Sequence, residues 1–296
     1  MLCELAAHQS FLATWLTLSA IAFVLLPAIS AAVFYRSYWA PTFAQWQRKT
    51  NPAYPPPSTV RREALTMARG LLAATLCPAL SLHGIEQGWS KAYCGISERG
   101  AGYLLLSFVV VWIGTDLYEF LYHRLGHLWR LGWREHKAHH VFHNPTPFAV
   151  IADGSIDQLV RAAPLLLVPL VMPIQMDLLF FTFAAFFYGY GAYLHWGHEL
   201  RWPDAHQPWL NTSFQHYLHH ARSTWRRPLH TGFFFKLWDR LLGSAEASGP
   251  CLCSKCCVVR GERSPEAWAR VERPDYSVLL RPSFWWRGEA PPLRAL

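Results

Sequence analysis

Lysine and arginine are absent from the first ten residues, and no small-residue cleavage site follows the apolar run behind them. A cleaved signal peptide is therefore not expected. Strand patterns are almost absent and no segment repeats at a fixed period, so the chain is predicted to be nearly all helical. Charged residues are scarce as well, at 16% of 296 positions against 52% hydrophobic residues.

The seven cysteines give little sign of a disulfide framework. Four of them, Cys251, Cys253, Cys256 and Cys257, lie together on the side of the membrane that we expect to be reducing. The cluster could bind zinc or be palmitoylated, but the sequence has no second cluster at the spacing that zinc sites usually show. From residue 244 onward the sequence is rich in Pro, Arg and Cys, and a loose peripheral tail is the expectation.

Long apolar runs are what the sequence has in quantity. Four of them are long enough to cross a ~30 Å hydrocarbon layer at ~1.5 Å per residue. These runs are residues 11–35, 64–85, 101–121 and 178–195. A shorter run, 162–174, is interrupted by three prolines and predicts one leg of a re-entrant or buried hairpin with 178–195. The predicted fold is an all-α integral membrane protein with about four transmembrane helices, this hairpin leg and a cytosolic helical cap, in preference to a soluble bundle.

The distribution of basic residues predicts the orientation of these spans. The first ten residues carry no Lys or Arg and the 86–100 loop carries two, whereas the 36–69 segment carries six and the 199–243 segment is also basic. The positive-inside rule therefore places residues 36–63, 122–158 and everything after about 196 in the cytosol. The net charge of +8 then describes a basic cytosolic face that suits anionic headgroups or an acidic partner, with no need for nucleic acid.

Histidine is concentrated in one part of the chain, because 13 of the 15 histidines lie between residues 123 and 230. They form four groups whose i, i+3 or i, i+4 spacing places the imidazoles of each group on one face. The groups are His123 and His127; His136, His139 and His140; His195 and His198; and His216, His219 and His220.

If ten neutral imidazoles came together at one membrane face without a metal, many of their ring nitrogens would lack hydrogen-bond partners. They are too many for one ion and suit two, each with about five nitrogens and an open position. Imidazole ligands alone do not select the metal. A pair of ions beside an apolar cavity suits oxidation of a lipid C–H bond by O₂, which requires a redox metal, and zinc would be a substitute acquired during expression.

Acidic residues near the histidines are candidates for supporting roles. Asp116 and Glu119 precede His123 by seven and four residues on the same helical face, at a depth where ionisable residues are expensive and usually paired. Glu135 and Glu199 adjoin the second and third groups. Each of these two is expected either to support a histidine or to form an exposed ion pair.

The order of these motifs resembles the fatty acid hydroxylase / sterol desaturase superfamily of membrane di-iron oxygenases, over about residues 105–245. The motifs are HRLGH, HKAHHVFHNPTPFAV, LHWGH, HYLHH and FFFKLWDRLLGS. Within the superfamily, HHVFHNPTPFAV followed by SIDQLV is most similar to the sterol C5-desaturases, and residues 51–63 resemble the loop before their second helix.

The resemblance implies a sterol-biosynthetic oxidoreductase of the endoplasmic reticulum membrane. It would use two iron ions, O₂, and electrons from NAD(P)H through a reductase and cytochrome b5. Residues 1–100 would form N-terminal transmembrane helices and a linker, 101–245 the di-metal domain, and 246–296 a tail. Asp116 matches the acidic residue before the first motif. The ligands carried over are His123, His127, His136, His139, His140, His195, His216, His219 and His220, with His198 as a tenth where the desaturases have another residue.

The segment after the last histidine motif departs from the family. His230-Thr231-Gly232 stands where relatives carry Asn-Tyr-Gly, and the stretch is about four residues longer. We expect His230 to donate a hydrogen bond behind the ligands, although an extra ligand and a surface residue are the alternatives. Because of this departure, hydroxylation of a fatty acyl chain or a sterol methyl group stays open beside desaturation. A zinc-binding membrane protein without catalysis is the alternative outside enzymology.

Overall fold

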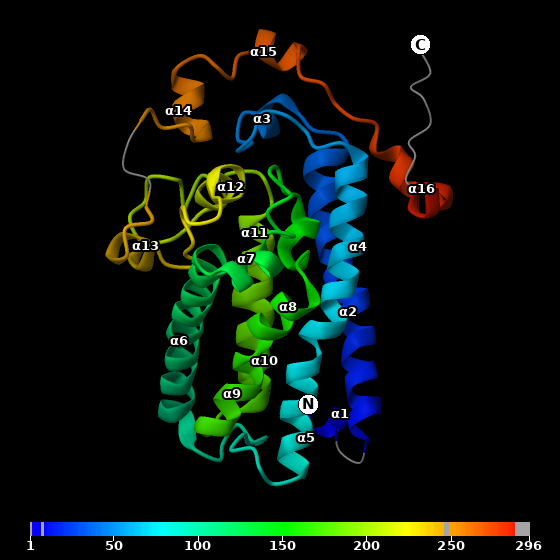
Figure 1. The fold of residues 1–296 in the computed structure, drawn as a ribbon, viewed down its shortest axis with the longest axis vertical. Helices are drawn as coiled ribbons and strands as arrows, with labels where there is room; N and C mark the ends of the chain where they lie inside the picture. Colours follow the sequence, from blue (N-terminus) through cyan, green and yellow to red (C-terminus); the bar gives the residue numbers. More distant parts are fainter. Residues whose placement is uncertain (1, 7–8, 246–248, 288–296) are drawn as a thin grey trace.

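The computed structural model describes residues 2–6, 9–245 and 249–287, which form an elongated helical protein (Figure 1). Within these ranges there are isolated β-bridges but no strand. The first helices are α1 (Leu2–Ala6), α2 (Phe11–Phe34), η1 (Tyr35–Trp39), α3 (Phe43–Trp46), α4 (Pro57–Ala74), α5 (Leu76–Glu86), α6 (Gly100–Leu128) and α7 (Arg130–His136). The next are η2 (Pro147–Ile151), α8 (Ser155–Ala162), α9 (Pro164–Val171), α10 (Met176–Thr182), η3 (Phe183–Gly189), α11 (Tyr190–Leu194) and α12 (Ser213–Arg222). The last are α13 (Leu237–Leu241), α14 (Ser254–Val259), α15 (Pro265–Ala269), η4 (Tyr276–Leu280) and α16 (Pro282–Arg287).

Four helical segments are long and apolar enough to cross a membrane, which confirms the predicted number of spans. They run along the long axis of the molecule (Figure 1). These segments are Phe11–Trp39, Pro57–Glu86, Gly100–Leu128 and Met176–Leu194. The second one is broken between α4 and α5, and Pro78 explains the break because its ring nitrogen cannot donate to the carbonyl of Ala74.

The proline-broken run forms a hairpin leg, as predicted. α8 and α9 lead away from α7 and α12, and the backbone N–H of Lys91 donates to the carbonyl of Pro169 (2.7 Å) at the far end. There the N–H of Tyr93 donates to the carbonyl of Ile174 (2.9 Å), and the chain returns through α10. The leg therefore extends from the histidine-rich end of the bundle to the 86–100 loop.

The predicted loose tail is wrong for the described residues 249–287. This segment folds back over the end of the molecule near α3 and α12 (Figure 1). The Ser254 N–H donates to the Glu199 carboxylate (2.6 Å), and the Arg263 guanidinium donates to the carbonyl of Lys49 (2.8 Å). The proline, arginine and cysteine content of this segment gave no sign of these contacts, because the partner residues lie far away in the sequence.

One disulfide joins the first ten residues to the 86–100 loop, the two segments poor in Lys and Arg that the positive-inside rule places on the lumenal side. It links Cys3 to Cys94, 91 residues apart, and it corrects the expectation that the cysteines would give little sign of a disulfide. It lies at the end of the bundle opposite to the histidines, whereas the cysteines at 251, 253, 256 and 257 are free thiols.

Candidate metal centre

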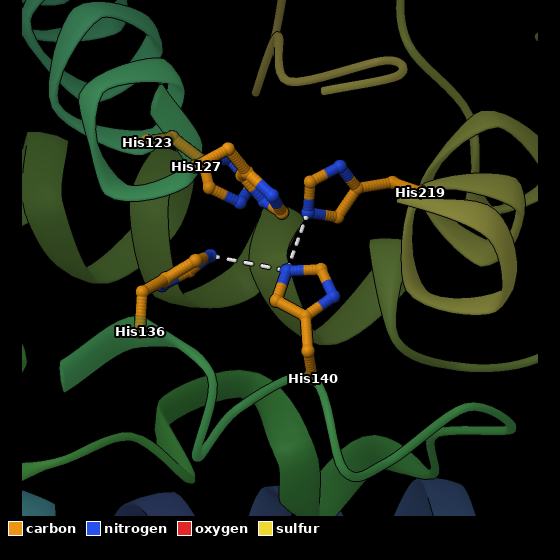
Figure 2. Close-up of side chains that lie close together, drawn as sticks. All are labelled: His123, His127, His136, His140 and His219. Carbon is orange, nitrogen blue, oxygen red and sulfur yellow. Dashed lines mark hydrogen bonds between the residues drawn. The ribbon is translucent and has the colours of Figure 1, made fainter. Parts of the chain in front are cut away.

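Nine of the ten predicted histidines come together in two neighbouring groups. Within each group the ring nitrogens that face one another lie within 4.8 Å. The larger group is His123, His127, His136, His140 and His219, whose rings converge on one point (Figure 2). The smaller group is His139, His195, His216 and His220. The rings of His140 and His220, one from each group, are 5.3 Å apart, so the groups are adjacent.

Four parts of the chain position these rings. The last turns of α6 supply the first motif, the end of α7 and the turn after it supply the second, and α12 supplies the fourth. His195 caps the C-terminus of α11. Gly126 allows α6 to approach α7, because a Cβ at this position would lie 3.2 Å from the Cγ atom of His136. A capping box of Thr212 and Gln215 starts α12 at a fixed residue and so fixes the faces of its histidines.

In the larger group, oxygen acceptors behind the rings fix the tautomer. The Nδ1 atoms of His123 and His127 lie 3.0 and 3.2 Å from the carbonyls of Thr231 and Thr224. A carbonyl oxygen only accepts, so Nδ1 carries the hydrogen and the Nε2 lone pair faces the group. His219 is arranged in the same way, with Nδ1 2.7 Å from the carbonyl of residue 229.

Carboxylates hold two further rings. Nδ1 of His136 donates to Asp157 (3.1 Å), and Nδ1 of His139 lies 2.5 Å from Asp153. Both carboxylates are almost fully buried. Burial alone would raise the pKa of Asp153, but His139 and Arg161 hold it well below its ordinary value. The carboxylates were not assigned this role from the sequence, although both lie in or beside the SIDQLV motif that carried the resemblance.

The Nε2 atoms of each group then face one another at short distances. Nε2 of His140 lies 3.1 Å from that of His136 and 3.0 Å from that of His219 (Figure 2). In the smaller group, Nε2 of His195 lies 2.9 Å from that of His216. Converging lone pairs repel one another unless a cation lies between them, so the donor set fits a metal ion in each group.

Burial favours the neutral form of several of these imidazoles, which is the form that binds metal. Burial lowers the pKa of His195 to about 3. Burial, followed by the neighbouring imidazoles, also lowers other pKa values well below the ordinary range of histidine. The residues concerned are His136, His140, His216 and His220. These five imidazoles therefore do not have to release protons before they bind a cation.

Two predicted site residues lie away from the converging nitrogens. His198 belongs to neither group: its Nδ1 lies 3.2 Å from the carbonyl of Trp196, and its ring contacts the ring of Tyr38. Asp116 accepts hydrogen bonds from the N–H of Phe234 (2.7 Å) and the indole of Trp238 (2.6 Å). Asp116 thus fastens the segment after the last motif to α6.

His230 and the remaining acidic residues take different positions. His230 has a positive φ of 48° and its N–H donates to the carbonyl of Ser244 (2.8 Å). Glu199 is buried and binds the 249–287 segment, whereas Glu135 forms the exposed ion pair with Arg134 (3.6 Å) that was its alternative. Glu119 contacts the Arg161 guanidinium at 2.6 Å.

An apolar cavity of about 340 Å³ lies among α2, α4, α5, α6, α8 and η3. Leu, Ile, Ala and Phe side chains make up most of its wall. Three of its polar lining residues, Glu119, Gln158 and Arg161, connect it to the two histidine groups. Gln158 and Arg161 donate to Asp153 (2.5 and 2.6 Å), and Asp153 holds His139. The cavity is within the ~300–1,000 Å³ range of small-molecule sites.

Residues 108–244 match the model of the fatty acid hydroxylase family. This segment is therefore similar to that family. The matched segment contains every histidine of the two groups. The fatty acid hydroxylase domain therefore supplies the whole candidate metal centre, whereas α2, α4 and α5 of the cavity wall lie outside it.

Curated relatives of the chain are sterol enzymes. Lathosterol oxidase of Rattus norvegicus is 29% identical over 188 residues, 62% of this chain and 60% of the relative. Lathosterol oxidase of Mus musculus is 31% identical over 56% of this chain and 55% of the relative. A Delta(7)-sterol 5(6)-desaturase of Gibberella zeae is 29% identical over 56% and 50%. The chain spans half to about 60% of the length of these relatives. No solved structure matches the chain significantly.

Proposed function

We propose that this protein is a sterol desaturase similar to the C5-desaturases, which removes two hydrogens from adjacent carbons of a membrane sterol. The observation that carries the proposal is the position of the two histidine groups at the polar end of an apolar cavity between candidate membrane spans. The similarity to lathosterol oxidases and Delta(7)-sterol 5(6)-desaturases supports the substrate class and the type of reaction.

The nine histidines would hold two iron ions, and the bound iron would supply the O₂-dependent oxidising power. The residues of this chain do the rest. Asp153 and Asp157 keep the rings of His139 and His136 oriented, with Nε2 toward the metals. The apolar wall binds the sterol rings and excludes water. The ion pair of Arg161 with Glu119 (2.6 Å) neutralises both charges beside the cavity, so that an uncharged lipid is not opposed by an unpaired charge.

The electron donor in this proposal is cytochrome b5, reduced by NAD(P)H through its reductase. Exposed basic residues surround the histidine end of the molecule on α7 and after α12. They are Arg130, Arg134, Lys137, Arg222, Arg226 and Arg227. A basic face of this kind attracts an acidic partner and accelerates its association.

We place the protein in the endoplasmic reticulum membrane with the histidines in the cytosol. The Cys3–Cys94 disulfide supports this orientation, because disulfides persist in the lumen and free thiols in the cytosol. Single-cysteine labelling with an impermeant maleimide in sealed microsomes tests it. Reagent added outside should reach residue 134 as cysteine, and it should reach residue 91 as cysteine only after permeabilisation.

The test of function is sterol profiling in a yeast that lacks its own C5-desaturase. Expression of the protein should restore the ring-B diene, and His139→Ala should not, at equal protein level. Hydroxylated sterols or fatty acids in place of the diene would instead identify a hydroxylase. Unchanged lipids, despite full iron loading and an active reductase, would indicate a metal-binding protein without turnover.

A further inference from the structure

We propose that His206, Cys251, Cys253 and Cys256 form a second, separate metal site, a structural Cys₃His zinc site. The four ligand atoms lie within 4.8 Å of one another. Nε2 of His206 is 3.3 Å from Sγ of Cys253, 3.4 Å from Sγ of Cys256 and 3.9 Å from Sγ of Cys251. The imidazole thus faces all three sulfurs at once.

These separations are those of a tetrahedron around zinc. With Zn–S of ~2.3 Å and Zn–N of ~2.0–2.1 Å, nitrogen and sulfur ligands of one ion lie ~3.5 Å apart. The two shorter distances differ from this value by only one or two tenths of an ångström, and the third by a few tenths. A zinc ion therefore fits between the four side chains with small side-chain adjustments and without a change of backbone.

The local backbone holds each ligand in place. The Asp204 carboxylate accepts from the N–H groups of His206 (3.0 Å) and Gln207 (3.1 Å), which forms a tight turn under the imidazole. The sequence Cys-Leu-Cys-Ser-Lys-Cys turns into α14, whose N-cap is Cys253. The next cysteine, Cys257, points elsewhere and bonds the carbonyl of residue 252 (3.4 Å).

The donor set selects zinc over the metal of the histidine centre. Three thiolates and one imidazole are a common set for structural zinc, and four protein ligands leave no open position for substrate. Cys253 is fully buried, and the other three ligands are partly or fully exposed, so a metal has access from solvent. The Arg260 guanidinium donates to the carbonyl of Cys251 (2.8 Å), which holds the backbone of this ligand in place.

The site would fasten the C-terminal segment to the loop that connects two ligands of the histidine centre. His206 lies in the loop between His195 and His216, and the carbonyl of Ala205 accepts from Gln215 of α12 (3.0 Å). Zinc binding would therefore stabilise the loop, α12 and α14 as one unit. The free energy of zinc binding is then part of the free energy of folding for this end of the molecule.

Cobalt substitution of the full-length protein distinguishes this site from the histidine centre, because only thiolates give a ligand-to-metal charge-transfer band in the near ultraviolet. We expect this band, together with the strong visible bands of a tetrahedral site, in the purified wild-type protein. Cys253→Ser and His206→Ala should reduce or shift these bands and remove one zinc ion per chain by mass spectrometry. Cys257→Ser, an adjacent cysteine outside the cluster, should retain both signals.

Three results would overturn the proposal. One is a cobalt spectrum that lacks the thiolate band in a folded wild-type protein. Another is equal zinc content in Cys253→Ser and Cys257→Ser. The last is a native protein in which mass spectrometry finds these cysteines acylated or joined in a disulfide. If Cys253→Ser does not fold, the Co²⁺ titration of the wild-type protein with and without prior alkylation of its thiols decides the question.

Discussion

At the scale of single residues, a histidine of this protein is a candidate ligand when its Nε2 faces other imidazoles, and in six of the nine rings an oxygen acceptor at Nδ1 fixes this direction. His123 meets this condition through the carbonyl of Thr231, and His139 meets it through Asp153. His198 does not, because its Nε2 has no hydrogen-bond partner among the described residues and belongs to neither group of converging nitrogens. Spacing in the sequence cannot make this distinction, because it is a matter of direction.

The contrast between His198 and His139 gives the first prediction. His198→Ala should retain both ions of the centre. His139→Ala should lose the ion of the smaller group, and it should also weaken binding of the ion in the larger group, because the turn after α7 carries both His139 and His140. Metal content of the purified proteins by mass spectrometry measures the difference. Equal loss in the two variants would mean that His198 reaches a metal after all.

Lys49 gives a prediction about pH. It is fully buried and its ammonium lies over the rings of Tyr38 (4.9 Å) and Tyr54 (5.0 Å). Burial, followed by the charge of Arg263, lowers its pKa from 10.5 to about 7. Between about pH 7 and pH 10.5 the unfolded chain binds a proton at Lys49 that the folded chain does not, so the free energy of unfolding rises with pH across this window. Below about pH 7 both states are protonated, and the folded protein bears the full free-energy cost of the buried ammonium.

Lys49→Met should therefore stabilise the protein by about 2–4 kcal/mol at pH 7, and the gain should shrink toward about pH 10. Thermal unfolding in detergent at both pH values measures it. Lys91→Met, at an exposed position at the opposite end, is the matched control and should not stabilise the protein by this amount at pH 7, because this side chain is not buried. A gain that is the same at both pH values would show that the buried ammonium is not the cause.

At the scale of elements, the spans and the histidine faces were predictable because each depends on neighbours in the sequence. Hydropathy over about 20 residues predicted the four spans, and three prolines predicted the hairpin leg. The contacts of the tail were not predictable. Cys251 and His206 are 45 residues apart, and no local pattern indicates that α14 returns to that loop.

In the loop after α11, the backbone conformation and the neighbouring side chain both require glycine at position 197. Gly197 has a φ of +73°, and a Cβ there would overlap the hydroxyl of Tyr38. This hydroxyl donates to the carbonyl of Trp196 (2.8 Å), and the carbonyl of Gly197 accepts from the N–H of Thr50 (3.0 Å). The turn therefore connects the end of α11, which carries His195, to the segment before α4.

Gly197→Ala should destabilise the protein by about 2–3 kcal/mol, because alanine is strained at positive φ and also overlaps Tyr38. Gly102→Ala is the matched control. It lies in α6 with no atom within 4 Å of the added Cβ, so it should be neutral or stabilising by up to ~1 kcal/mol. Melting temperatures in detergent compare the two. A Gly197→Ala protein as stable as wild type would show that the turn tolerates another conformation.

At the scale of the whole molecule, the two ends differ in chemistry and the cavity connects them. A disulfide closes one end, and the histidine centre and the free thiols of residues 251–257 occupy the other. The cavity wall is formed by α2 and α5 as well as by the fatty acid hydroxylase domain. The N-terminal helices thus contribute to substrate binding under the proposed function, although they lie outside the matched segment.

Filling the cavity from α2 tests this contribution. Ala22 lines the cavity, and Ala28 lies on the same helix, is exposed and does not line it. Ala22→Trp should lower the yield of desaturated sterol in the yeast assay by at least ~10-fold, because the indole occupies space that the sterol rings need. Ala28→Trp should leave the yield unchanged, and both variants should keep full metal content, because α2 supplies no ligand. Equal yields from the two variants would mean that the sterol reaches the metal centre without entering this cavity.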